Sequence, residues 1–471
     1  MRVLLQIRPD YRERPGGDAT QATRTAEELR LLGVEAELVG GLVPDLGGYD
    51  LVHIFNTQVI GDPVRQAIRA RRWGLPVVVS PIYWNPAGFR LATRDPDHDG
   101  AGQRALDHAE RALQRLTLGA ARLLLPNSRA EAAQIAATFP GLGANIRVVS
   151  NAVDRRYADG DGARFCARHG LTPRGFVLCA GRKEALKNQL ALIRACRDLA
   201  LPLVLAGQET DEAAGYIAAC RAQAAESPTP VLFLPNLAPD DLADAYAAAR
   251  VHAQPSFHET VGLSSLEAAL GGAQIVTTVN SGAAEYLGER ARYCDPTSSD
   301  SLAAALAAAW SAPSRQGVDP PIPTGHSWRQ AAEDTLRGYE EVLRMTTDDA
   351  TTRWLPEVPD GAYIAHLEDL IQLQLEATAA RDAQFAALEA ANRRLYAEFQ
   401  ELQGLHQGQE RHAAALGAGL AAEAAERRRA EDAFRTLETQ VQEQRDYTAK
   451  VEAALAAREQ EPGRWGRKRN G

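Results

Sequence analysis

The chain has 471 residues, of which 45% are hydrophobic, and this length is enough for more than one globular domain with its own core. Its net charge of −9 is spread along the sequence, with no long basic run before the last few residues, so nucleic acid is not expected as a partner of the body. The five cysteines are widely spaced without a CxxC pair, which disfavours a metal or redox centre and is typical of reduced thiols in a cytosolic protein.

The N-terminal part alternates short β-rich runs with amphipathic stretches. It begins MRVLLQIRPDYRER, where charge interrupts a short apolar run, so neither a signal peptide nor a spanning helix is expected there. Helical patterns cover Ala19–Leu32 and Gln103–Leu118. The strand-like runs are, in order, VLLQI, VEAELVG, DLVHIF, VVVS and RLLLPNS. This alternation predicts a parallel sheet with crossover helices, an α/β domain over residues 1–155.

A second series of strand-like runs, each followed by a helical pattern, predicts another doubly wound domain over residues 156–325. The runs are FVLCAG, LPLVLAG, VLFLP, VHAQPS and QIVTTV. Such domains bind ligands at the carboxyl ends of their strands, so we expect the site in a cleft between the two. Prolines then break the pattern before SWRQAAEDTLRGYEEVLRM, which predicts an amphipathic helix within residues 326–348 that packs back on the core.

After Pro359 the sequence follows a heptad, which predicts a long helical coiled coil over residues 360–460 and self-association through it. The frame continues to Leu455. Its two core positions begin with Ile364, Ile371, Thr378, Phe385, Asn392 and Phe399, and with Leu367, Gln374, Arg381, Leu388, Leu395 and Leu402. Four glycines predict a break near residues 404–419. The basic tail, residues 461–471, has two interpretations, contact with an anionic membrane or a solvated end, and the sequence does not choose between them.

The sharpest motif is PSFHETVGLSSLEAALGG, in which Glu259 and Glu267 bracket a loop that runs into a helix. The backbone N–H groups of Thr260, Val261 and Gly262 at a helix amino terminus would form a site for a diphosphate. If the intervening residues were mostly helical, the two carboxylates would lie roughly 12 Å apart along the axis, too far for a hydrolytic acid–base pair. An ordinary helix with a capping glutamate is the alternative that the spacing leaves open.

Two further clusters follow strand ends. Arg182 and Lys187 stand where cations can neutralise a diphosphate leaving group without metal. Gly16 and Gly17 follow the first strand and are expected at the cleft, with Asp18 able to cap the next helix. A solvated basic loop and a tight turn are the alternatives. No GxGxxG stands between a strand and a helix, which argues against a dinucleotide oxidoreductase.

The order and spacing of these motifs resemble the retaining GT-B glycosyltransferases of the large family-four type. The resemblance covers residues 1–345 and rests on the GG loop, LLPNSRAE, VVSNAVD, AGRKEALKN, SFHETVGLSSLEAALGG and SGAAEYLG. It implies two Rossmann-like domains that face a cleft, the first on the acceptor side and the second binding the nucleotide sugar. It also implies a front-face displacement that retains the anomeric configuration and needs no metal or other cofactor.

The resemblance also implies roles for individual residues. Arg182 and Lys187 would hold the donor diphosphate, with help from the backbone near Gly16. Glu259 would bind hydroxyls of the transferred sugar, and Glu267 the ribose of the nucleotide. Glu259, Lys187 and Arg182 thus form the expected catalytic set. The remaining expected donor-binding residues are Gly17, His258, Thr260, Val261, Gly262 and Leu263.

One position departs from the family pattern. Many relatives carry a histidine in a short HD-like motif after a first-domain strand, where this chain reads VVVSPIYWNP, with Ile82 and Tyr83 near that place. This departure leaves the donor sugar open. His53, on an earlier strand, is predicted to be a core or cleft-lining residue.

The predicted function is transfer of a sugar from a UDP- or GDP-sugar to a glycan or lipid-linked acceptor, in bacterial cell-surface polysaccharide synthesis. The expected location is the cytoplasm, with peripheral contact at the inner membrane face left open. A non-catalytic sugar-nucleotide-binding coiled-coil scaffold and a sugar-nucleotide epimerase remain as alternatives. The sequence does not name the donor sugar, the base, the acceptor, the linkage or the number of associating chains.

Overall fold

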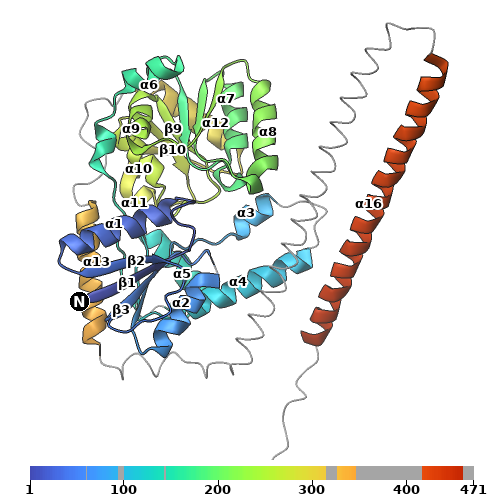
Figure 1. Cartoon of the computed structure of the whole chain (residues 1–471). Coiled ribbons are helices and arrows are strands. Elements are labelled where there is room, and N and C mark those ends of the chain that lie inside the picture. Colours follow the sequence, from blue (N-terminus) through green and yellow to red (C-terminus); the bar gives the residue numbers. More distant parts are fainter. Residues whose placement is uncertain (60, 94–99, 143–144, 314–325, 346–415, 460–471) are drawn as a thin grey trace, which may run out of the picture. The chain divides into compact units, whose positions relative to one another are not determined.

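Two parallel β-sheets, each covered by helices, form the body of the chain (Figure 1). The computed structural model describes residues 1–59, 61–93, 100–142, 145–313, 326–345 and 416–459. The first sheet takes its strands from the first 124 residues, and the second from residues 177–294. The expected fold class, two doubly wound Rossmann-like domains, is confirmed.

The first sheet has the order β2-β1-β3-β4-β5, and all its pairs are parallel. β3 and β4 are buried along their whole length, as expected for strands that helices cover on both faces. The strands are β1 (Arg2–Ile7), β2 (Glu35–Gly40), β3 (Leu51–Phe55), β4 (Val77–Ser80) and β5 (Leu123–Leu124). The helices are α1 (Gly17–Leu31), α2 (Gly61–Arg72), α3 (Ala87–Ala92), α4 (Gly100–Ala120) and α5 (Arg129–Thr138).

The second sheet has the order β11-β10-β9-β6-β7-β8, again entirely parallel. Its strands are β6 (Val177–Ala180), β7 (Leu203–Ala206), β8 (Val231–Leu234), β9 (Val251–Gln254), β10 (Gln274–Thr278) and β11 (Ala291–Cys294). The sequence did not predict β11, since this edge strand has only four residues and the charged Arg292 interrupts it. Its helices and single turns are η1 (Arg155–Ala158), α6 (Gly162–His169), η2 (Ala185–Lys187), α7 (Gln189–Asp198), η3 (Asp211–Ala213), α8 (Ala214–Ala225), α9 (Pro239–Ala248), α10 (Leu263–Leu270), α11 (Ala284–Leu287), η4 (Gly288–Arg290) and α12 (Ser299–Ser311).

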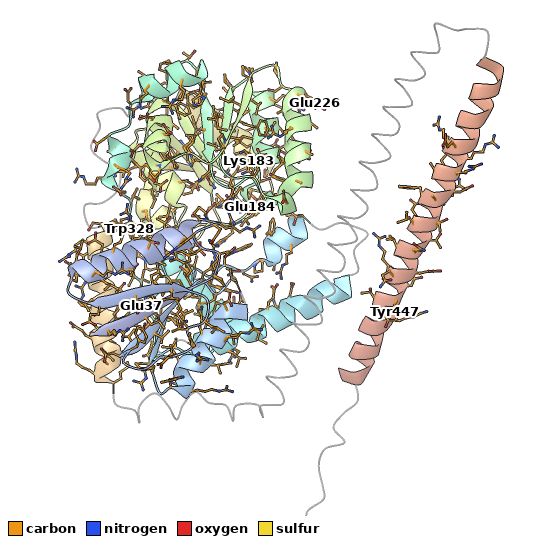
Figure 2. All side chains as sticks on the ribbon, in the orientation of Figure 1. Glu37, Lys183, Glu184, Glu226, Trp328 and Tyr447 are labelled. Atoms are coloured by element: carbon orange, nitrogen blue, oxygen red, sulfur yellow. The ribbon has the colours of Figure 1, made fainter. Side chains whose placement is uncertain are left out.

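Helix α13 (Trp328–Arg344) follows the second domain in sequence but packs on the core of the first, with Trp328 at its start (Figure 2). The buried hydroxyl of Tyr339 lies 2.6 Å from Nδ1 of His53, whose Nε2 lies 2.9 Å from the hydroxyl of Ser80. Burial lowers the pKa of His53 to about 3, so this imidazole is neutral. His53 is therefore a core residue that ties α13 to β3 and β4.

The tail belongs to a different structural unit from the one that holds both sheets. Its described part is one helix, α16 (Leu416–Glu459), which includes Gly417 and Gly419 without a break. Three successive heptad core positions on it are more than 40% exposed: Phe434, Leu437 and Val441. The earlier heptads, the glycines at 404 and 408, and the basic ending lie outside the described residues. No helix in the described ranges is long and apolar enough to span a membrane.

Candidate active site

The loop of residues 255–262, here called the Glu259 loop, connects the carboxyl end of β9 to α10. The backbone of Glu259 forms a parallel bridge to Ser281, and its N–H is donated to the carbonyl of Asn280 at 3.0 Å. α10 begins only at Leu263. The helical spacing assumed for Glu259 and Glu267 therefore does not apply, because the residues up to Gly262 are not helical.

The Glu259 carboxylate is the centre of a charged cluster. Its Oε1 accepts hydrogen bonds from Lys187 Nζ at 2.7 Å, Ser256 Oγ at 2.6 Å and Gln254 Nε2 at 3.1 Å. The Glu259 side chain is 12% exposed and that of Lys187 17%. Burial alone would raise the pKa of Glu259, but the charge and hydrogen bond of Lys187 outweigh it and hold this pKa below its usual value. Glu259 is therefore ionised at neutral pH.

The structure separates the basic residues that follow β6. Lys187 bonds to the carboxylate of the cluster, whereas Arg182 is 45% exposed and pairs with Glu184 at 3.2 Å. Lys183 turns inward and donates to two backbone carbonyls at 2.5 and 2.7 Å, and its burial lowers its pKa. Lys183 and Glu184 lie on the side of the second domain that faces the first (Figure 2). The sequence pattern selected Lys187, which the structure places in the cluster, and it left the structural role of Lys183 unaddressed although both follow the same strand.

Glu267 lies on α10 in a different electrostatic environment. Its Oε2 accepts a hydrogen bond from the hydroxyl of Tyr246 at 2.9 Å, and Tyr157 also hydrogen-bonds to this carboxyl. Burial raises the pKa of Glu267 to about 7, because these hydroxyls do not offset the loss of water and Asp154 adds like charge. The two glutamates of the motif therefore differ in protonation near neutral pH.

The glycine pair of the first domain adjoins the amino terminus of α10. A Cβ atom on Gly17 would lie 3.7 Å from a methyl group of Leu263. Gly16 is the N-cap residue of α1. Asp18 does not cap that helix as expected; it lies in the first turn and pairs with Arg8 at 2.8 Å. The first-domain loop thus reaches the start of the second domain's helix.

The start of α10 is open to an anion. Its N-cap residue is Gly262, whose φ of +77° lies in the left-handed region that glycine adopts without strain. No side chain caps this helix, so its first backbone N–H groups are not satisfied by a capping oxygen. Val261 is 2% exposed and Thr260 is partly buried. Backbone groups here, rather than side chains, are suited to a phosphate.

An aromatic contact links the two domains beside Glu259. The rings of Trp84 and His258 are stacked, with centroids 5.2 Å apart and planes 11° apart, and Phe89 contacts Phe257 at 5.4 Å. Burial lowers the pKa of His258 to about 4, so it is neutral at physiological pH. Ile82, near the position where the histidine was missing, has a φ of +49°. Sequence analysis did not single out Trp84 or Phe89: Trp84 stands in the VVVSPIYWNP segment that departs from the family pattern, and Phe89 belongs to no motif.

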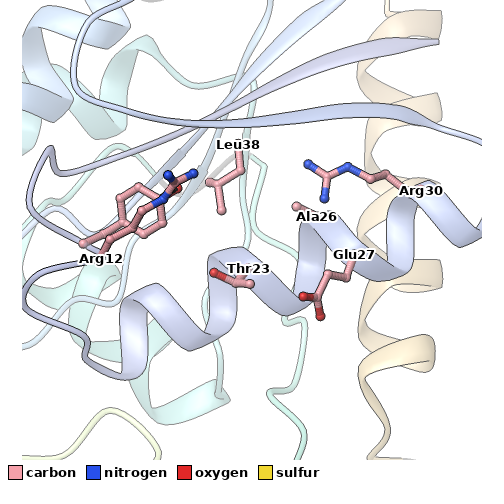
Figure 3. A pocket seen from close by; sticks show the side chains of 7 residues that line it. Arg12, Thr23, Ala26, Glu27, Arg30 and Leu38 are labelled. Atoms are coloured by element: carbon pink, nitrogen blue, oxygen red, sulfur yellow. Dashed lines mark hydrogen bonds between the residues drawn. The ribbon is translucent and has the colours of Figure 1, made fainter.

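A hollow of about 340 Å³ lies elsewhere on the first domain, between α1 and β2 (Figure 3). Both of its arginines have intramolecular acceptors: Arg12 Nε bonds to the Tyr11 hydroxyl and Arg30 Nε to the carbonyl of Ala36. The lining residues are Tyr11, Arg12, Thr23, Ala26, Glu27, Arg30 and Leu38. None of them belongs to the Glu259 cluster.

The known proteins that this chain resembles are glycosyltransferases. Residues 167–328 match the family model described as glycosyl transferases group 1. The D-inositol 3-phosphate glycosyltransferases of Rhodococcus jostii and Acidothermus cellulolyticus are each 29% identical to this chain, over 59% and 49% of its length and 62% and 52% of theirs. The O-antigen chain mannosyltransferase B of Escherichia coli is 27% identical over 40% of this chain and 46% of its own. The chain thus spans less than two thirds of each of these relatives.

Solved structures share the fold. Sucrose-phosphate synthase from Thermosynechococcus elongatus matches with a TM-score of 0.55 and 15% identity, covering 81% of this chain and all of that one. Anabaena HepE in complex with UDP-glucose matches with a TM-score of 0.53 and 16% identity, covering 73% of this chain and 98% of that one. The two domains have the GT-B fold, and the resemblance to the GT-B glycosyltransferases is confirmed.

The raised pKa of Glu267 predicts a pH-dependent effect of Glu267→Gln. Because this pKa is about 7 in the folded chain against an ordinary 4.5, the unfolded chain loses the proton first, and wild-type stability falls as the pH rises from about 4.5 to 7. Glutamine can still accept the Tyr246 bond but carries no charge. We expect the free energy of unfolding of the variant, relative to that of the wild type, to rise between pH 5 and pH 8 by up to roughly 3 kcal/mol.

Thermal unfolding midpoints at pH 5, 6, 7 and 8 measure this effect. The control is Glu226→Gln, which makes the same change on an exposed side chain and should show no such trend. If the unfolding midpoints of Glu267→Gln and the wild type differed by the same amount at every pH, the raised pKa of Glu267 would be contradicted.

Proposed function

We propose that this chain transfers a sugar from a UDP- or GDP-sugar to a glycan or lipid-linked acceptor, with retention of the anomeric configuration and without a bound metal. The observation that carries the proposal is the buried Glu259–Lys187 pair beside the uncapped start of α10, in the region that matches the group 1 glycosyl transferases. An anion, a cation and a helix amino terminus in one place suit a ligand with both hydroxyls and a diphosphate.

In the proposed reaction the acceptor hydroxyl attacks the anomeric carbon on the face from which the diphosphate leaves. The bond from this carbon to the diphosphate oxygen breaks, a bond to the acceptor oxygen forms, and the acceptor proton passes to the leaving diphosphate. Lys187 and the first N–H groups of α10 stabilise the charge that develops on the diphosphate. The exposed Arg182 would exchange its contact with Glu184 for one with the diphosphate. Gly16 and Gly17 of the first domain, which lack side chains, would let the backbone approach the diphosphate closely.

The two glutamates hold the two ends of the donor. Glu259 is ionised and accepts hydrogen bonds from hydroxyls of the transferred sugar. All its bonds among the described residues go to Oε1, so Oε2 is the oxygen that a ligand can take. Glu267 accepts from the ribose hydroxyls, with His258, Thr260, Val261 and Leu263 lining the site between.

The names of the relatives point to different acceptors, a small phosphorylated polyol in one case and a growing glycan in the other. We favour a glycan or glycoconjugate made in the cytoplasm for the bacterial surface, with peripheral contact at the inner membrane face. A scaffold that only binds sugar nucleotide would show donor binding without transfer or hydrolysis. An epimerase would convert the donor without any acceptor.

Loss of either member of the central pair should abolish turnover. Glu259→Gln and Lys187→Met are each expected to lower kcat by a hundredfold or more, because each removes a group that stabilises the transition state. Initial rates with a saturating donor measure the effect, and Glu226→Gln on the exposed surface is the control. Near-wild-type turnover in both variants would contradict the proposed roles.

Each single substitution leaves a mostly buried charge without its partner, which could reduce activity through destabilisation. The double variant Glu259→Gln/Lys187→Met separates these causes, since it is neutral and has similar volume. It should recover much of the thermal stability lost by the single variants and remain inactive. Recovery of turnover in the double variant would show that the pair serves only the fold.

The donor can be identified by ligand-induced stabilisation. A nucleotide sugar at 100 times its dissociation constant adds about 2.7 kcal/mol to the free energy of unfolding. We expect one donor of a UDP- and GDP-sugar panel to raise the unfolding midpoint clearly, with ATP as the control that should not. Equal midpoints with every sugar nucleotide would count against a donor site.

We further propose that α16 joins chains into an oligomer, two or three in parallel, since Phe434, Leu437 and Val441 are exposed at successive heptad core positions. A charge in this row would be buried in the assembly. Leu437→Asp/Val441→Asp in the full chain, and removal of the residues after Pro359, should both give a monomer by light scattering. Glu438→Asp, on a non-core position, is the control. If both altered forms kept the number of associated chains of the wild type, self-association through the tail would be contradicted.

A further inference from the structure

Helix α5 of the first domain takes part of its amino-terminal cap from the second domain. The carboxylate of Glu285, in the first turn of α11, accepts the N–H groups of Ala130 at 2.7 Å and Arg129 at 3.0 Å. The first N–H groups of a helix have no acceptor within the helix, and an anion at this end is favoured by the helix dipole. If the domains separated, these N–H groups would lose their carboxylate.

The next residue adds a second connection. The Tyr286 hydroxyl donates to the carbonyl of Asn127 at 2.7 Å and accepts from the N–H of Asn151 at 2.9 Å. Asn127 directly precedes the N-cap of α5, and Asn151 lies in the segment that connects the domains. The Tyr286 side chain is 4% exposed, so both bonds are shielded from water.

The same segment supports the Glu259 loop. The N–H of Gly282 is donated to the carbonyl of Thr260 at 3.0 Å. A Cβ atom on Gly282 would lie 2.5 Å from that oxygen and 2.7 Å from the hydroxyl of Ser128, the N-cap of α5. Residues 280–286 are therefore packed between the Glu259 loop and the start of α5.

The start of α5 in turn supports the first-domain side of the site. The Glu131 carboxylate accepts the N–H of Tyr83 at 2.8 Å and that of Asn127 at 2.7 Å. Tyr83 precedes Trp84, whose ring stacks on His258 in the Glu259 loop. The contacts thus form a continuous ring: the Glu259 loop contacts residues 280–286, these contact the start of α5, α5 holds Tyr83, and the neighbouring Trp84 contacts the Glu259 loop again.

We propose that Glu285 and Tyr286 are positioning residues, an interdomain latch that sets the Glu259 loop against the first domain without touching the substrate. The inference rests on the proposed function for its effect on turnover, because acceptor and donor are held by different domains. Nucleotide affinity should be little affected, since every side chain assigned to the nucleotide belongs to the second domain and the first domain offers it only the backbone of Gly16 and Gly17.

Hydrogen exchange tests the latch independently of activity. In Glu285→Gln the amides of residues 129 and 130 should exchange at least tenfold faster than in the wild type, because they bond to different carboxylate oxygens and an amide side chain has only one accepting oxygen. Tyr286→Phe, which removes only the hydroxyl, should accelerate exchange at residue 151. Glu289→Gln, on the exposed turn that follows, is the matched control. Unchanged exchange at both positions would overturn the proposal.

Kinetics then test the positioning role. Both variants should lower kcat about tenfold or more while the dissociation constant of the nucleotide changes less than twofold. A loss of kcat matched by an equal loss of nucleotide affinity or of folded protein would overturn the role and indicate general destabilisation. If the wild-type chain transfers no sugar, the proposed function fails, and the exchange rates still decide whether the latch exists.

Discussion

A carboxylate and an ammonium group that are both withdrawn from water depend on each other, and Glu259 and Lys187 are such a pair. Removing an ion from water costs several kcal/mol, which an uncompensated charge would not recover. The pair is formed because β6 and β9 are neighbours in the sheet although β7 and β8 lie between them in sequence. Parallel strands bring their carboxyl ends to one edge, so the doubly wound topology is what places the lysine beside the glutamate.

The two glutamates of the motif share a loop and a helix but not a protonation state. Lys187 keeps the pKa of Glu259 low, whereas burial among tyrosines raises that of Glu267 to about 7. A ligand hydroxyl donates more strongly to a carboxylate than to a carboxylic acid, so a ligand bound to Glu267 would favour its ionised form. With the donor bound as proposed, binding at this end of the site would therefore release a proton, while binding at Glu259 would not.

The sequence was informative where a pattern is local. Apolar strand runs and helical periodicity predicted both sheets, and the order of the motifs indicated the fold. It selected Lys187 but did not show what Lys183 does, because the direction of the Lys183 side chain depends on the carbonyls of Gly207 and Leu234. It placed Asp18 at a cap, whereas Arg8 draws that carboxylate into an ion pair. Trp84 and Glu285 were missed as site-forming residues since their partners belong to the other domain.

The chain crosses between the domains twice, and this limits how the site can open. At the first crossing Ala152 belongs to the first core and Val153 to the second, so the change of domain takes a single residue. The second crossing returns α13 to the first core, where the buried Tyr339 and His53 hold it. Two covalent connections permit hinge-like rotation rather than free separation. Any separation of the domains would break the contacts of Glu285, Tyr286 and Trp84, so a substrate that contacts both domains would favour the arrangement in which they are intact.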